Sequence, residues 1–218
     1  MNITSTMHGD VALLAMDDGK ANAMNTGSLG ALGDALDQAQ ATAKAVILTG
    51  RDGVFSGGFD LKVMKETPEA VPALVEAGGR MALRLFTYPR PLVLAATGHA
   101  IALGAVFLCC ADVRIGRVGP YKVGLNETAI SMVLPNFARE VALYRLPKAK
   151  VDEAVLQAQI YPHEEGLGVG YFDALDEDPV GAALKKAEAL AQLPTETFAA
   201  QKLALRKEVI ASIEAKIV

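Results

Sequence analysis

One apolar segment of the chain reads Leu92-Val-Leu-Ala-Ala-Thr-Gly-His-Ala-Ile-Ala-Leu-Gly-Ala-Val-Phe-Leu108. Its first five residues predict a short, fully buried strand, residues 97–99 interrupt the apolar run as a turn would, and a helix is expected over residues 104–110. By length alone the segment could span a membrane. The interruption, and Asp112 and Arg114 directly after the segment, favour a buried strand, turn and helix instead.

The flanking sequence repeats this alternation of strand and helix. Apolar runs predict further strands at residues 11–16, 46–49 and 113–115, and apolar residues at helical spacing predict helices at 29–41 and 73–86. Strands that alternate with helices predict a parallel sheet with right-handed crossovers, so the fold class is α/β.

The strand signals fade beyond Pro120. Helices are expected there over residues 137–145, 150–159, 180–192 and from 195 to the end. We therefore expect a core domain over residues 1–175 and a C-terminal helical segment over residues 176–218. The apolar stripes of that segment need a partner, which is either its own core or a neighbouring subunit.

The composition limits the partners and the compartment. The chain has 25 acidic and 21 basic residues and a net charge of −4, which argues against nucleic acid but leaves room for a few lysines that bind phosphates. Cys109 and Cys110 are adjacent in an apolar run, which indicates buried thiols in a reducing compartment. Residues 1–10 carry no secretory signal pattern, so a cytoplasmic location is expected.

Two loops with small residues follow predicted strands. Phe55-Ser-Gly-Gly-Phe-Asp60 comes after the strand at 46–49, and its paired glycines let backbone N–H groups approach a ligand. Gly104 and Ala105 stand where a helix is expected to begin, and the first turn of a helix offers unpaired amides to a negative oxygen. Each loop alone could be an ordinary turn, and Asp60 could be a helix N-cap. Together they could converge on one oxygen atom, as acyl chemistry requires.

The paired loops resemble the oxyanion loops of the crotonase (enoyl-CoA hydratase/isomerase) family. The resemblance covers about residues 10–175 and implies a crotonase (ClpP-like) fold of stacked ββα units with a C-terminal helical region. It implies that the two amide donors belong to Phe59 and Ala105. Lys20-Ala-Asn-Ala-Met-Asn25 is similar to the family's segment near coenzyme A (CoA). The residues implied in CoA binding are Lys20, Asn22, Phe59, Asp60, Leu61 and Lys62.

The resemblance also indicates which reaction to expect. The family's hydratases hold a water between two glutamates, and alignment of residues 102–108 puts Leu108 where the first should stand. Gly124-Leu-Asn-Glu-Thr128 is similar to the Δ3,Δ2-enoyl-CoA isomerases, which implies that Glu127 moves a proton from C2 to C4 of a 3-enoyl thioester. A carboxylate suits this role if a dry pocket raises its pKa. From the residues alone, Glu127 would be an ordinary first-turn helix residue.

The remaining expectations concern ligands, partners and rival functions. His99 is expected to make one backbone hydrogen bond, and no metal-ligand spacing appears, so no metal and no cofactor beyond the CoA of the substrate are expected. The resemblance implies an acyl-CoA substrate, neither nucleic acid nor membrane as a partner, and a homotrimer or homohexamer. Residues 65–72 and the helix at 73–86 are expected to line the acyl pocket. The alternatives are an enoyl-CoA hydratase, a thioesterase or decarboxylase, and a non-catalytic CoA-thioester-binding protein.

Overall fold

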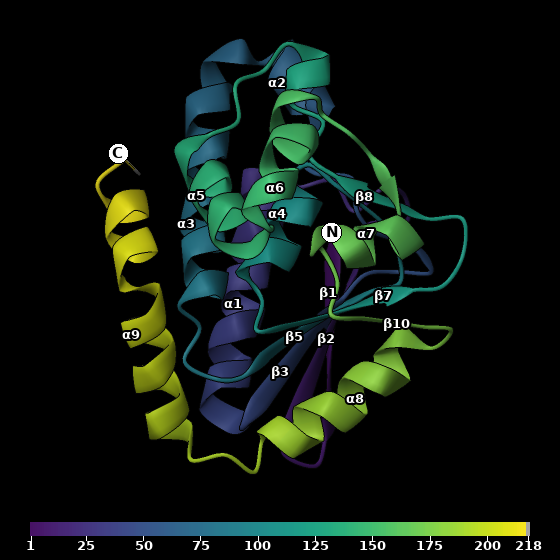
Figure 1. Ribbon diagram of the computed structural model, residues 1–218. Helices are drawn as coiled ribbons and strands as arrows, with labels where there is room; N and C mark the ends of the chain where they lie inside the picture. The colour runs from purple at the N-terminus through teal and green to yellow at the C-terminus, as the bar shows by residue number, and fades with distance from the viewer. Residues whose placement is uncertain (217–218) are drawn as a thin grey trace.

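The computed structural model describes residues 1–216, and they form two sheets with helices around them (Figure 1). The larger sheet has the strand order β1-β2-β3-β5-β7-β10 and the smaller one the order β4-β6-β8-β9. The larger sheet consists of β1 (Asn2–His8), β2 (Val11–Asp17), β3 (Ala45–Thr49), β5 (Leu92–Ala96), β7 (Val113–Arg117) and β10 (Ala174–Asp176). The smaller sheet consists of β4 (Gly53–Ser56), β6 (Gly98–Ile101), β8 (Lys122–Gly124) and β9 (Tyr161–Pro162).

From β3 to β8, successive strands of the chain go alternately to the two sheets. β3, β5 and β7 lie side by side and parallel in the larger sheet, while β4, β6 and β8 lie parallel in the smaller one. Helices follow these strand pairs: α2 (Leu61–Glu66) and α3 (Val71–Phe86) after the first, α4 (Leu103–Cys110) after the second, and α5 (Asn136–Arg145) after the third. The predicted stack of ββα units is therefore confirmed.

Three short strands contradict the expectation that strands end at Pro120. β8, β9 and β10 have only three, two and three residues, so they are too short to show any periodicity in the sequence. They exist because neighbouring strands pair with them, β8 with β6 and β10 with β7. The expected helix at 150–159 is also wrong in its extent, because α6 (Lys148–Val151) passes into a π-helical turn at Asp152–Leu156.

The helical layers cover both faces of the larger sheet. α1 (Thr26–Thr42), α3 and α4 lie on one side, and α8 (Pro179–Leu190) lies on the other (Figure 1). Small residues of α8, Ala183 and Ala187, pack against β3, β5 and β7 through Ile47, Val93 and Ile115. The apolar face of α8 therefore packs on the chain's own core, one of the two partners considered for the C-terminal helices. Within residues 1–216, no helix combines the length and the apolarity that a membrane span requires.

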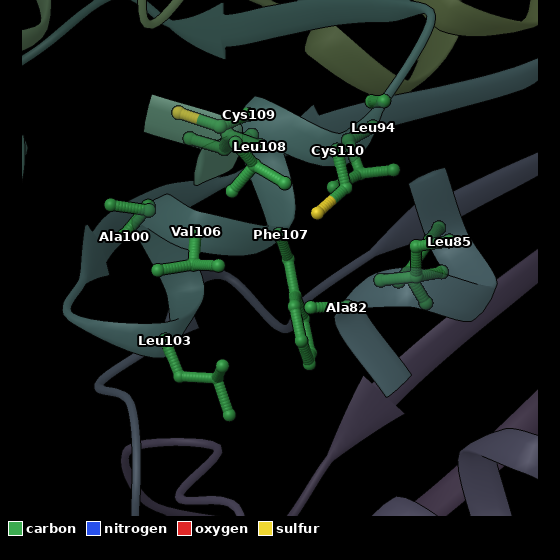
Figure 2. Packing of buried hydrophobic residues seen from close by; sticks show 14 of the residues in the cluster. Ala82, Leu85, Leu94, Ala100, Leu103, Val106, Phe107, Leu108, Cys109 and Cys110 are labelled. Atoms are coloured by element: carbon green, nitrogen blue, oxygen red, sulfur yellow. The ribbon is translucent and has the colours of Figure 1, made fainter. Parts of the chain in front are cut away.

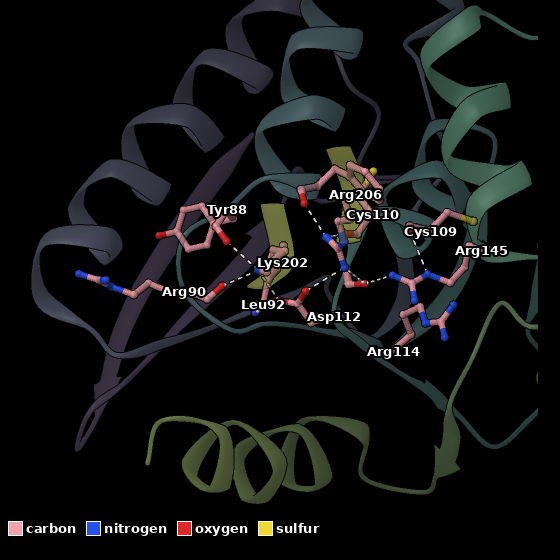
Figure 3. A network of polar contacts seen from close by, with 12 residues as sticks. Tyr88, Arg90, Leu92, Cys109, Cys110, Asp112, Arg114, Arg145, Lys202 and Arg206 are labelled. Carbon is pink, nitrogen blue, oxygen red and sulfur yellow. Dashed lines mark hydrogen bonds and ion pairs between the residues drawn. The ribbon is translucent and has the colours of Figure 1, made fainter. Parts of the chain in front are cut away.

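The last helix, α9 (Thr195–Glu214), packs against α3 and α5, and its buried charges bind it to the segments that follow α3 and α4 (Figure 3). Lys202 donates to the carbonyls of Tyr88 (2.6 Å) and Arg90 (2.9 Å) and to the carboxylate of Asp112 (2.6 Å). Arg206 contacts the other oxygen of Asp112 at 2.9 Å. Burial lowers the pKa of Lys202 to about 8, against the opposing charge of Asp112. The lowered pKa of Lys202 shows that Asp112, which both cations share, offsets only part of the cost of burying them.

Candidate active site

A small pocket opens where the carboxyl ends of β4, β6 and β8 meet. These three strands are parallel neighbours, so the loops that follow them share one edge of the smaller sheet. The pocket encloses about 50 Å³. Its walls are formed by Gly57, Phe59, Leu61, Ala102, Asn126, Glu127, Ile130 and Met132. Both predicted loops and the predicted base therefore contribute to one site.

The loop after β4 leaves a single amide unpaired. The N–H of Gly57 donates to Ala21 (2.8 Å), that of Gly58 to the Ser56 hydroxyl (3.1 Å), and that of Asp60 to Met24 (2.9 Å). For the N–H of Phe59, the described residues provide no acceptor. Of four consecutive amides, the one left available is thus the predicted donor.

Asn22 holds this loop in place from beneath. Its side chain is fully buried and donates to the carbonyls of Met16 (3.0 Å) and Phe55 (3.1 Å) while accepting the N–H of Asp18 (2.9 Å). All its polar atoms are therefore occupied within the protein, and it supports the loop without lining the pocket. Lys20, two residues earlier, is exposed and also lies outside the pocket walls.

Two close approaches fix the loop between helices. Gly58 has φ = +92°, and a Cβ there would lie 2.7 Å from the Cβ of Ala102. The ring of Phe59 rests on α3 at Gly78, where a Cβ would lie 2.4 Å from its Cζ. Any larger residue at either glycine would displace the loop that presents the Phe59 amide.

The N-terminus of α4 forms the opposite wall. Ala102 has φ = 52° and ψ = −121°, a conformation that costs a residue with a Cβ about 1–3 kcal/mol. The three N–H groups that follow, on Leu103, Gly104 and Ala105, belong to the first turn and have no intrahelical acceptor. The nitrogen of Leu103 lies beside the loop, 3.2 Å from where a Cβ of Gly58 would be. Ala105 is fully buried and does not line the pocket.

No carboxylate comes from α4. Its sequence, LGAVFLCC, is entirely apolar apart from the two thiols, and every one of its residues is buried. Leu108 lies in the core with Val106, Phe107 and Cys109 and does not line the pocket (Figure 2). Burial raises the pKa of Cys109 to about 11, which keeps this thiol protonated and inert near neutral pH.

Glu127 is the titratable side chain in the pocket wall. It is 9% exposed, and its Oε2 atom has no hydrogen-bond partner among the described residues. Burial raises the pKa of Glu127, and the backbone N–H groups of Glu127 and Asn126 oppose this rise. A buried carboxylate with a raised pKa and one open oxygen is equipped to accept and return a proton.

The other predicted contact residues lie at the rim or perform structural work. Asp60 accepts the N–H of Lys62 (2.9 Å) and is the N-cap of α2, which was one of the two roles predicted for it. Leu61 is 51% exposed and forms part of the mouth, and Lys62 is exposed beside it. His99 accepts the backbone N–H of Lys122 (3.1 Å), as expected. Within the part of the chain that the structure describes, no three side chains are grouped as metal ligands.

Several wall residues had no signal of their own in the sequence. Ala102 reaches the pocket through an unusual backbone conformation, and Ile130 and Met132 reach it because the chain turns back after Glu127. That turn is closed by the N–H groups of Ile130 (3.1 Å) and Met132 (2.9 Å), which both donate to the Glu127 carbonyl. In the sequence, Asn126 had no predicted role and was noted only because it precedes Glu127.

Comparisons with known proteins identify the family and agree with the fold. The family model described as "Enoyl-CoA hydratase/isomerase" matches residues 6–217. A family protein from Pseudomonas syringae has 36% identity and a TM-score of 0.96 over 99% of this chain and 94% of its own. A protein of Mycobacterium tuberculosis is named enoyl-CoA isomerase in one solved structure and probable enoyl-CoA hydratase in another. Both structures have 36% identity and a TM-score of 0.94, over 99% of this chain and 95% or 92% of their own. A "probable enoyl-CoA hydratase" of Bacillus subtilis is 30% identical over 83% of this chain and 71% of its own.

Proposed function

The chain belongs to the enoyl-CoA hydratase/isomerase family, and from this we propose that it is an enoyl-CoA isomerase that moves a double bond from C3 to C2 of an acyl-CoA thioester. The observation that carries the proposal is the pocket wall itself. Among the described residues that line it, Glu127 is the one titratable residue, and it shares the wall with Phe59, whose amide has no acceptor within the part of the chain that the structure describes. A single carboxylate can carry one proton from carbon to carbon without help from a second acid or base.

In the proposed reaction, the thioester oxygen lies between the Phe59 amide and the first turn of α4. Glu127 removes a proton from C2, the electrons move onto the thioester oxygen, and the two amides stabilise the resulting dienolate. Glu127 then returns the proton at C4, so that the double bond lies between C2 and C3. For the second donor, the Leu103 amide has a stronger claim than Ala105, because its nitrogen lies beside Gly58.

The size of the pocket bears on the substrate. A volume of about 50 Å³ accommodates only the reacting carbons, so the rest of the acyl chain is proposed to leave past the apolar rim of Leu61 and Ile130. Lys20 and Lys62 remain proposed contacts of the CoA phosphates, because exposed lysines near the mouth can attract them. A homotrimer or homohexamer is proposed on the family resemblance.

Hydration is the second candidate, and relatives named as hydratases favour it. Adding water requires one group to activate the water and one to protonate C2. Since α4 supplies no acid, Glu127 would have to serve both purposes. We therefore expect hydration to be slower than isomerisation. A non-catalytic CoA-thioester binder is the third possibility.

The test compares both reactions in one preparation. The purified protein is given a 3-enoyl-CoA and crotonyl-CoA in turn, and products are followed by mass spectrometry. We expect isomerisation in the wild type, at least a 1,000-fold loss in Glu127→Gln, on the order of what removing an essential acid–base group costs, and full activity in Glu153→Gln, whose carboxylate pairs with Lys150 instead. Hydration that equals or exceeds isomerisation would reverse the ranking. Thioester binding without any product would leave only a binder.

A further inference from the structure

One side chain takes part in fixing the amides of the loop after β4. The N–H groups of Gly57 and Asp60 donate to backbone carbonyls, which no substitution of a side chain removes. The N–H of Gly58 donates instead to the hydroxyl of Ser56, at 3.1 Å. Among the described contacts of these amides, Ser56 therefore supplies the one that depends on a residue type, and it lies next to the free N–H of Phe59.

The hydroxyl of Ser56 is fixed in its orientation. Ser56 is the last residue of β4 and is fully buried. Its hydroxyl accepts the Gly58 N–H and donates its own hydrogen to the carbonyl of Asn22, at 2.8 Å. Turning the hydroxyl elsewhere would leave an N–H and a carbonyl unpaired in the interior, which is costly. Ser56 thus holds Gly58 in one place relative to the segment that contains Asn22.

The segment that Ser56 joins to the loop is itself held firmly. The N–H of Met24 donates to the Gly58 carbonyl (2.8 Å), so the segment and the loop also pair through their backbones. The Asp18 carboxylate accepts the N–H of Asn22 (2.8 Å) and fixes the segment from its other end. The loop is therefore anchored through Ser56 to a part of the chain that has its own hydrogen bonds.

The main chain of Ser56 touches the first turn of α4. A Cβ at Gly104 would lie 2.5 Å from the carbonyl oxygen of Ser56 and 3.0 Å from its Cβ, so the end of β4 and the start of α4 are in close contact. This turn carries the second set of amides of the proposed oxyanion site. Ser56 therefore contacts both donors, the Phe59 loop through its hydroxyl and α4 through its backbone.

The spacing of the two donors decides whether they can act together. Both must lie about 2.7–3.1 Å from one developing oxyanion. A misplacement of about 1 Å costs on the order of 100-fold in rate. Since the donors are backbone amides, their positions depend on the groups that hold the backbone, and Ser56 is the side chain that links them.

We propose that Ser56 is a positioning residue of the oxyanion site, which turns the Phe59 N–H into the pocket and sets its distance from the first turn of α4. The inference rests on the proposed function, because it takes the thioester oxygen as the group that the two amides bind. Ser56 is not among the residues that line the pocket, so it acts on the substrate only through the amides. Its loss should therefore lower kcat more than it raises KM.

The test observes the carbonyl of a bound thioester. Butyryl-CoA labelled with ¹³C at C1 has no double bond to move, and its C=O stretching frequency falls when hydrogen bonds polarise it. In difference infrared spectra we expect the wild type to lower this frequency below its value in water, and Ser56→Ala to reverse most of the shift. For isomerisation of a 3-enoyl-CoA, kcat of Ser56→Ala should fall about 10- to 100-fold while KM changes by less than about threefold.

Ser28→Ala is the matched control. Ser28 is also a buried serine whose hydroxyl accepts a backbone N–H (2.8 Å) and donates to a backbone carbonyl (2.9 Å), both of Asn25. These bonds belong to the capping box of α1, away from the loop after β4. The two substitutions remove the same atom and the same kinds of bond, so we expect similar losses of stability in urea. Ser28→Ala should keep the carbonyl frequency and kcat of the wild type.

Gly104→Ala disturbs the same contact from the side of α4, because its Cβ would press on the Ser56 carbonyl, and it should also raise the carbonyl frequency. Ser56→Ala decides when it folds, and Gly104→Ala decides when it does not. A wild-type frequency in the deciding variant, an equal rise in Ser28→Ala, or a wild type that lowers the frequency no further than water would overturn the inference. If the wild type lowers the frequency and Ser56→Ala reverses the shift, but no isomerisation occurs, the proposed function fails and the inference stands.

Discussion

Gly78 gives the most direct test of how the site is built. A Cβ at Gly78 would lie 2.4 Å from Cζ and 2.6 Å from Cε1 of the Phe59 ring, whereas ordinary contacts begin at 3.4 Å. In Gly78→Ala the ring must therefore retreat by about 1 Å, and the Phe59 amide moves with it. A displacement of that size at a positioning group costs about 100-fold in rate. We expect kcat/KM for isomerisation to fall by about this factor.

Substitutions at two other glycines distinguish an effect on the position of the Phe59 loop from an effect on stability. In Gly79→Ala the new Cβ would meet the ring of Phe137 at 2.9 Å, away from the loop, so we expect a stability loss of about 1–3 kcal/mol with activity retained. In Gly30→Ala nothing lies within 4 Å, and helix propensity should add up to about 1 kcal/mol. Stopped-flow assays and urea unfolding measure the two quantities. Unchanged kcat/KM in Gly78→Ala would refute the reasoning that the Phe59 loop positions the oxyanion.

Three further predictions concern stability. Asp112→Asn leaves Lys202 and Arg206 without their carboxylate and should lower the free energy of unfolding by about 3–5 kcal/mol, whereas Asp10→Asn, which breaks an exposed pair with Lys44, should cost less than about 1 kcal/mol in the same urea series. The pKa of Glu127 is higher in the folded protein than in the unfolded chain. The stability that its protonation contributes is therefore fully present below about pH 4.5, and it is lost as the pH rises through the folded pKa. Glu127→Gln should thus be more stable than the wild type at pH 8 and equal to it near pH 4, and equal stability at both would contradict the burial argument. Ala102→Gly should raise the melting temperature by relieving the positive φ, and a fall of several degrees would show that no strain is stored there.

The strands and helices that sequence patterns could predict are those with a buried face. β3 and β5 are buried at every residue and read as continuous apolar runs, and α3 shows a helical stripe. β1 is mostly exposed, and β8, β9 and β10 have only two or three residues, too few for an alternating pattern to repeat, so their partners in the sheets determine them. The C-terminal helices were visible, but their buried Lys202 and Arg206 could not be told from surface charges.

The site, too, was predictable only in part. Phe59 and Glu127 belong to the sequence motifs that resemble the family, and both line the pocket. Asn22 stands in such a segment too, yet its side chain serves the loop and not the ligand. Ala105 and Leu108 were placed by aligning their segment with the family's second oxyanion loop, and such an alignment does not show which end of a helix turns toward a cavity. That depends on the backbone at Ala102, which adopts a conformation no pattern of residue types predicts.

The arrangement of the smaller sheet bears on the choice between the two proposed reactions. Three parallel strands end at one edge, and each contributes one loop: a spare amide after β4, the start of a helix after β6, and a carboxylate after β8. The helix is too thoroughly buried to carry an acid, since every residue of α4 packs into the core. A second carboxylate would therefore have to come from another element, and none of the described wall residues supplies it. With two kinds of donor for an oxyanion and a single proton carrier among the described wall residues, this geometry supports the proposed transfer of a proton between carbons of one enolate over the addition of water.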